Sequence, residues 1–155
     1  MEIKKLTDLI VELKNRPAKR LVAVNAIDEH TMDAINEAVE HGIVQATLTG
    51  DPEKIKNTCN ILGIDVSKFT IEPAFSEDEA ARKGVELVTS GKADIMMKGL
   101  LSSDKYLRAI LNKDCGLLPP KGILSHVTVI ENHNYHKLLI VSDVELFLIP
   151  IFIKK

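Results

Sequence analysis

Cysteine is scarce in this sequence. Cys59 and Cys115 stand alone, with no CxxC motif and no metal-ligand spacing. We interpret Cys115 as a plain thiol, because no obvious activating partner accompanies it in the sequence. The N-terminus also lacks the charged-then-apolar plan of a signal peptide. We therefore expect a reduced, cytoplasmic protein.

Long apolar runs and an excess of positive charge are also missing. The longest apolar run, 146–153, has eight residues and contains Pro150, so it is far too short to span a bilayer. Twenty basic residues stand against 22 acidic ones, and no basic run is interleaved with aromatic residues. These absences argue against a membrane protein and against a nucleic-acid-binding surface.

The residues that are present have the make-up of a soluble globular domain, with 45% hydrophobic and 27% charged residues over 155 positions. As far as Asn112, apolar periodicity alternates between strand and helix. Strands are predicted at 21–24, 45–49, 69–72 and 93–97, and helices at 3–13, 28–41, 51–62, 76–88 and from about residue 102 onward. This alternation predicts an α/β fold, with a mostly parallel sheet and helices on both faces.

The pattern changes after Asn112. Residues 113–122 are rich in glycine and proline and predict a long loop. Two strand-like runs, 127–131 and 137–141, predict an antiparallel hairpin. No repeat or interdomain linker interrupts the chain, so we expect 1–155 to form a single α/β domain.

The central stretch carries the strongest candidate site. Lys98, Gly99, Ser102 and Ser103 lie between the predicted strand 93–97 and the following helix. The first N–H groups of a helix have no partner within it, and a cation, a glycine and hydroxyls beside them suit a phosphate or carboxylate. Ligands also gather at the carboxyl ends of parallel strands. The simpler interpretation is that Ser102 or Ser103 only caps the helix.

Three histidines near the hairpin are weaker candidates. His133 and His136 lie close to Glu131 in the sequence, but side chains at a hairpin tip alternate faces, so we expect no metal site. His126, beside Ser125, either contacts phosphate or is a satisfied histidine at the start of a strand, and we favour the second interpretation. Asp143 either orients a catalytic group or caps a turn, and the sequence leaves both open.

With these segments placed, the sequence resembles the N-terminal part of the phosphate acetyltransferase and phosphate butyryltransferase family. The resemblance is carried by VQATLTGDPEKI (44–55), ADIMMKGLLSSDKYLRAILNKDCGL (93–117), ILSHVTVIE (123–131) and YHKLLIVSD (135–143). The KGLLSS, LSH and SD elements match the butyryl branch more closely than the acetyl branch.

The resemblance implies an acyltransferase that exchanges an acyl group between coenzyme A and inorganic phosphate, without a metal or organic cofactor. It further implies two α/β domains of the isocitrate and isopropylmalate dehydrogenase-like kind, a cleft between them, and a homo-oligomer. The residues that match the family's substrate- and phosphate-binding positions are Lys98, Gly99, Ser102, Ser103, Ser125, His126, Ser142 and Asp143.

Two departures from the family affect what the chain is expected to do. Family enzymes are longer, and their serine-rich catalytic segment lies beyond the part matched here, so no residue is assigned a catalytic role. The tail 146–155 also departs from the family pattern. We therefore expect a truncated N-terminal part of a two-domain acyltransferase, with phosphate acetyltransferase as the close alternative activity. The alternative of another class is a non-catalytic remnant that binds anions or self-associates through uncovered apolar surface at 138–153.

Overall fold

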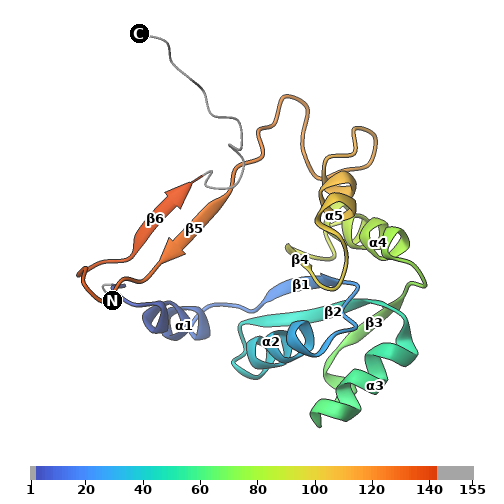
Figure 1. The fold of residues 1–155 in the computed structure, drawn as a ribbon, viewed down its shortest axis with the longest axis horizontal. Helices are drawn as coiled ribbons and strands as arrows, with labels where there is room; N and C mark the ends of the chain where they lie inside the picture. Colours follow the sequence, from blue (N-terminus) through green and yellow to red (C-terminus); the bar gives the residue numbers. More distant parts are fainter. Residues whose placement is uncertain (1–2, 143–155) are drawn as a thin grey trace.

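A parallel sheet forms the centre of the molecule (Figure 1). The structure, a computed structural model, describes residues 3–142, so the predictions for Asp143 and for the tail lie outside the described residues. The strands run in the order β3-β2-β1-β4, and every neighbouring pair is parallel. Their bounds are β1 Lys19–Val24, β2 Val44–Gly50, β3 Thr70–Pro73 and β4 Ile95–Lys98.

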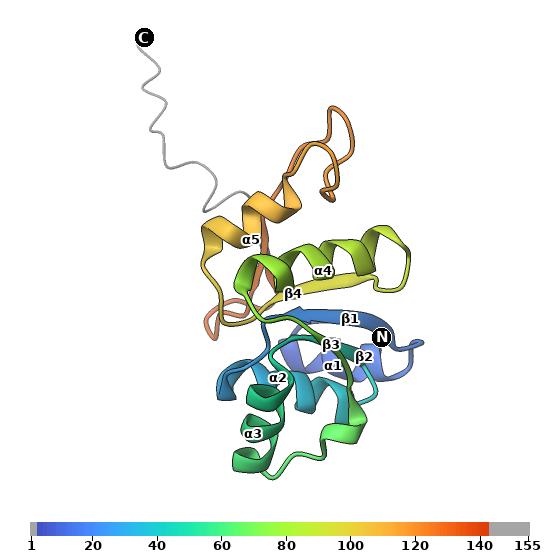
Figure 2. The same cartoon turned by 90° about the vertical axis from the view of Figure 1, so that its right-hand side faces the viewer.

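Helices cover both faces of this sheet, as the alternating pattern predicts (Figure 2). The helices α2 (Glu29–Glu40) and α3 (Pro52–Leu62) lie on one face, and α4 (Glu77–Thr89) and α5 (Ser103–Ile110) lie on the other. Alternate residues of β1 supply the two cores. Leu21 and Ala23 pack with α2 and α3, whereas Val24 packs with the alanines of α4.

Local side-chain and backbone contacts set the ends of these helices. The side chains of Asp28, Asp51 and Ser76 accept hydrogen bonds from backbone N–H groups in the first turns of α2, α3 and α4. Gly63 ends α3 in the left-handed conformation, with φ of 66°. These local contacts explain why the helix bounds follow the sequence closely.

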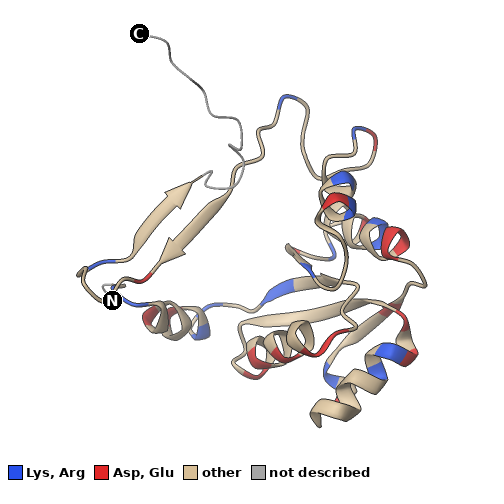
Figure 3. Cartoon of the chain, viewed as in Figure 1, with Lys and Arg blue, Asp and Glu red and all other residues tan. Residues whose placement is uncertain are grey.

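The hairpin is a separate element, set apart from the parallel sheet in Figure 1. It pairs β5 (Val127–Ile130) with β6 (Leu139–Ser142) in the predicted antiparallel sense. The opening helix α1 (Leu6–Lys14) lies beside it, and the N–H of Leu6 donates to Glu131 Oε2 over 2.8 Å. Figure 3 shows that β5 and β6 carry no charged residue. Within 3–142, no helix has the length and apolar character that crossing a membrane requires.

Candidate functional site

The topology places the carboxyl ends of β1 and β4 side by side. From β1 the chain moves outward through β2 and β3, and then returns to the other side of β1 as β4. Val24 and Lys98, the last residues of these strands, are partners in the parallel register. In open α/β sheets, such a reversal of strand order leaves a crevice where ligands bind. The predicted anion turn between β4 and α5 therefore begins at this crevice.

The turn approaches β1 so closely that it needs a glycine. The N–H of Gly99 donates to the carbonyl of Val24 over 2.9 Å, and the N–H of Leu100 donates to that of Asn25 over 3.0 Å. A Cβ on Gly99 would lie 2.6 Å from the Val24 oxygen and 2.7 Å from the Asn25 oxygen. Because both are backbone atoms, neither can move aside without shifting β1. Gly99 is therefore required by this contact itself.

The two serines of the turn have different roles. Ser102 is the N-cap of α5, since its hydroxyl accepts from the N–H of Lys105 over 3.2 Å. The simpler interpretation of the sequence thus holds for Ser102. No residue within the described part of the chain accepts a hydrogen bond from the N–H groups of Ser103 and Asp104 or from the Ser103 hydroxyl. These donors remain available to an anion at the helix N-terminus.

Two lysines near the turn differ in their availability. Lys98 is exposed, and among residues 3–142 its ammonium forms no hydrogen bond or ion pair. The Lys105 ammonium lies 3.1 Å from a carboxylate oxygen of Glu77 and 3.4 Å from one of Asp78. The hydrogen bond that the Lys105 ammonium donates to Glu77 is the main cause that raises the pKa of Lys105. Lys98 is therefore the cation at this turn that an incoming anion can use.

A half-buried tyrosine fixes the helix that follows. The hydroxyl of Tyr106 donates to the carbonyl of Met96 over 2.8 Å, which ties α5 to β4. Burial raises the pKa of the Tyr106 phenol, so it stays a donor at neutral pH. Leu101, only 6% exposed, packs beside it in the core beneath α4 and α5. The start of α5 therefore has a fixed position relative to Lys98.

Asn25 is a residue of this site that the sequence reasoning missed. It follows β1 directly, is 8% exposed, and has a left-handed backbone with φ of 53°. Its side-chain amide donates to the carbonyl of Leu100, and its own N–H donates to Thr49 Oγ1 over 3.2 Å. The local signal at this position, an asparagine directly after the apolar run 21–24, indicates a turn but not a contact to Leu100.

The other predicted residues lie elsewhere. Ser142 pairs with Val127 across the open end of the hairpin, next to Ser125 and His126. The His126 Nε2 atom lies 3.5 Å from Thr128 Oγ1. Ser125, His126 and Ser142 thus all lie at the open end of the hairpin, and Figure 1 places this hairpin apart from β4 and α5. Glu131, considered as a metal ligand, instead accepts the hydrogen bond from α1.

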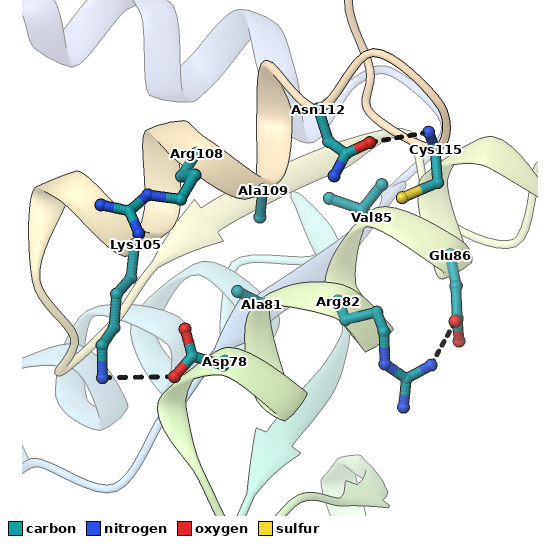
Figure 4. Close-up of a pocket in the computed structure, with 10 residues that line it drawn as sticks. All are labelled: Asp78, Ala81, Arg82, Val85, Glu86, Lys105, Arg108, Ala109, Asn112 and Cys115. Atoms are coloured by element: carbon teal, nitrogen blue, oxygen red, sulfur yellow. Dashed lines mark hydrogen bonds and ion pairs between the residues drawn. The ribbon is translucent and has the colours of Figure 1, made fainter.

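A pocket of about 270 Å³ opens between α4 and α5 (Figure 4). Ala81, Val85 and Ala109 form its apolar part. Of the charged groups around it, Arg82 pairs with Glu86, and Lys105 with Asp78. Because these charges are paired within the protein, the pocket is a less favourable anion-binding site than the turn.

Comparison with known proteins gives related sequences over nearly the whole chain. No protein-family model matches it. Phosphate butyryltransferase from Clostridium acetobutylicum is 38% identical over 142 residues, which are 92% of this chain and 47% of that protein. The enzyme of the same name from Clostridium beijerinckii is 36% identical, and the match covers 90% of this chain and 46% of that protein. Phosphate acetyltransferase from Rickettsia typhi is 27% identical, with 87% and 38% covered.

The chain is related to the phosphate acetyltransferase and phosphate butyryltransferase family. The predicted family relation is thereby confirmed, and the chain spans about half the length of the family members it matches. Solved structures agree on the fold. A phosphotransacetylase from Streptococcus pyogenes superposes with a TM-score of 0.70 at 17% identity, covering 88% of this chain and 50% of that one. A branched-chain phosphotransacylase from Enterococcus faecalis superposes with a TM-score of 0.62 at 20% identity, covering 81% of this chain and 42% of that one. The further likeness to isocitrate and isopropylmalate dehydrogenases stays a prediction.

Proposed function

We propose that this chain contributes to a phosphate acyltransferase, in which the turn between β4 and α5 holds inorganic phosphate or the phosphate of an acyl phosphate. One observation carries the proposal. In a chain related to phosphate butyryltransferases, the turn combines an uncompensated Lys98 with free donors at Ser103 and Asp104, at the point where the strand order reverses.

The reaction transfers the acyl group of a coenzyme A thioester to phosphate. A phosphate oxygen attacks the carbonyl carbon, the carbon–sulfur bond breaks, and the thiolate leaves and takes up a proton. Holding phosphate still beside the thioester lowers the entropy cost of this encounter. Lys98 supplies a positive charge. The Ser103 hydroxyl and the N–H groups of Ser103 and Asp104 donate hydrogen bonds that orient the phosphate. We assign no residue of this chain to protonating the thiolate.

Ser125, His126 and Ser142 form a second group in this proposal, at the open end of the hairpin. With Asp143, outside the described residues, they keep their predicted role in binding substrate. We further propose that the active enzyme has two α/β domains and forms a homo-oligomer, uses acyl-CoA and phosphate as substrates, and needs no other cofactor. The isolated cysteines support a reduced, cytoplasmic setting.

The butyryl branch is the favoured activity, because the Clostridium phosphate butyryltransferases are 36–38% identical to this chain whereas the Rickettsia typhi phosphate acetyltransferase is 27% identical. One observation favours a second candidate function. The hairpin exposes apolar side chains, with Ile140 75% and Val127 60% exposed, and a non-catalytic chain that binds anions or self-associates through this surface is the second candidate.

A thiol-release assay tests the proposal. The chain is incubated with butyryl-CoA or acetyl-CoA, with and without phosphate, and release of the coenzyme A thiol is compared with that in Lys98→Ala and Ser103→Ala variants. Lys113→Ala, which changes an exposed loop lysine, is the matched control. We expect phosphate-dependent release that the first two variants reduce and the control leaves unchanged. No release from folded protein would favour the non-catalytic candidate.

Phosphate binding is measured separately, by following amide NMR signals during titration with inorganic phosphate. We expect the amide signals of Gly99, Ser103 and Asp104 to shift, and to shift much less in Lys98→Ala. Unchanged signals at the turn at high phosphate concentration would refute its assignment as the phosphate site.

A further inference from the structure

We propose that Asn25 is a positioning residue that holds the turn between β4 and α5 in its anion-binding shape. The inference rests on the proposed function and deepens it. Asn25 contributes to phosphate binding through Leu100 and not by touching phosphate. Nothing in the sequence motifs of the turn points to this residue, since it lies 75 positions earlier in the chain than Leu100.

Asn25 holds the peptide groups on both sides of Leu100. Its backbone carbonyl accepts from the N–H of Leu100 over 3.0 Å, and its side-chain amide donates to the carbonyl of Leu100. Leu100 is 55% exposed, so burial does little to hold this residue in place. The middle of the turn is therefore fixed mainly through hydrogen bonds to Asn25.

Asn25 is itself held rigidly. Its N–H donates to Thr49 Oγ1, and the Thr49 hydroxyl donates to the carbonyl of Ala80 over 3.2 Å. Thr49 is fully buried, so this chain of contacts joins β1, β2 and α4 without exposure to water. Asparagine also tolerates the left-handed backbone better than most residues. The sheet and α4 thus determine where the Asn25 amide points.

Loss of the Asn25 side-chain contact also affects the groups that would bind the anion, because the turn is short. Lys98 lies two residues before Leu100, and Ser103, the first residue of α5, lies three residues after it. Leu101 is anchored by burial and Gly99 by its hydrogen bond to Val24, so losing the side-chain bond from Asn25 loosens the segment between these two anchors. The Lys98 ammonium and the donors at Ser103 then no longer share one fixed geometry. Phosphate then binds less tightly, because the turn must become ordered when phosphate binds, and this ordering costs conformational entropy.

The test uses the full chain and Asn25→Gly. Glycine adopts the left-handed backbone freely but has no amide, so this change removes the side-chain contact without backbone strain. Asn112→Gly is the matched control: its side chain accepts from the N–H groups of Asp114 and Cys115 at the opposite end of α5. We expect phosphate affinity, from the amide titration, to fall about tenfold in Asn25→Gly and to stay within about twofold in the control.

A second readout separates positioning from general stability. Hydrogen exchange of the Leu100 amide, measured without phosphate, should accelerate in Asn25→Gly while amides of α2 and α3 keep their protection. If the wild-type chain binds phosphate at the turn and Asn25→Gly binds it with the same affinity, this inference is overturned. The proposed function then still stands. A wild-type chain that shows no phosphate shifts at the turn would overturn both.

Discussion

Alanine in place of Gly84 should destabilise the protein, although glycine is a poor helix former. Gly84 lies in α4, on the face that packs against the sheet. A Cβ there would lie 2.6 Å from Val24 Cγ2 and 3.0 Å from Met96 Cε. Carbon atoms in contact are normally separated by about 3.5–4.0 Å. The methionine can move aside, but Val24 is fully buried in β1 and cannot.

Two opposing effects set the magnitude. Replacing glycine by alanine within a helix gains about 1 kcal/mol from helix propensity. Overpacking a core costs about 1–3 kcal/mol. The free energy of unfolding should therefore fall by about 0–2 kcal/mol in Gly84→Ala, measured by urea titration with circular dichroism.

A double mutant decides between this explanation and a general effect of alanine. Val24→Ala removes the methyl group that the new Cβ would meet. In that background, Gly84→Ala should become neutral or stabilising by up to about 1 kcal/mol. Gly91→Ala is the matched control, because Gly91 has a positive φ and no neighbour near its Cβ position, so its cost should not depend on Val24. A stabilising Gly84→Ala in the wild-type background, or additive effects of the pair, would refute the steric argument.

Three further predictions concern the site and the sheet. Gly99→Ala should abolish the phosphate-induced amide shifts, because its Cβ would meet the backbone oxygen of Asn25. Thr49→Val should lower the free energy of unfolding in urea by about 1–3 kcal/mol, because it leaves a buried N–H without an acceptor. The guanidinium of Arg20 holds the pKa of Asp94 well below its usual range, so this pair stabilises the fold above pH of about 4. That stability is lost as the pH falls further, and thermal melts of Asp94→Asn should depend less on pH below about 4.

The sequence predicted the elements of the fold because their signals are local. Asp51 and Ser76 accept hydrogen bonds from N–H groups two and three residues ahead, and Gly63 follows the last residue of its helix. The alternation of strands and helices likewise indicated a parallel sheet covered on both faces. The turn from Lys98 to Ser103 could be located for the same reason, since strand end, glycine and helix cap adjoin in the chain.

Asn25 could not be found in this way because its role depends on distant residues. Its partners are 24 positions away at Thr49 and 75 positions away at Leu100. A left-handed asparagine after a strand is compatible with many ordinary turns, so the residue type alone does not indicate a contact to β4. Only the strand order, with β4 returning beside β1, brings these partners together.

The hairpin shows why a strand can be predicted more readily than its surroundings. Residues 138–141 are four consecutive apolar residues, a pattern typical of a strand buried on both faces. In the structure, Ile140 is 75% exposed and Val127, on the opposite strand, is 60% exposed. Within the described residues, α1 packs beside this hairpin and helps to stabilise it, but it leaves these apolar side chains exposed. The uncovered apolar surface predicted at 138–153 is thus present in its described part, and self-association stays the expectation because a second polypeptide surface would bury these side chains.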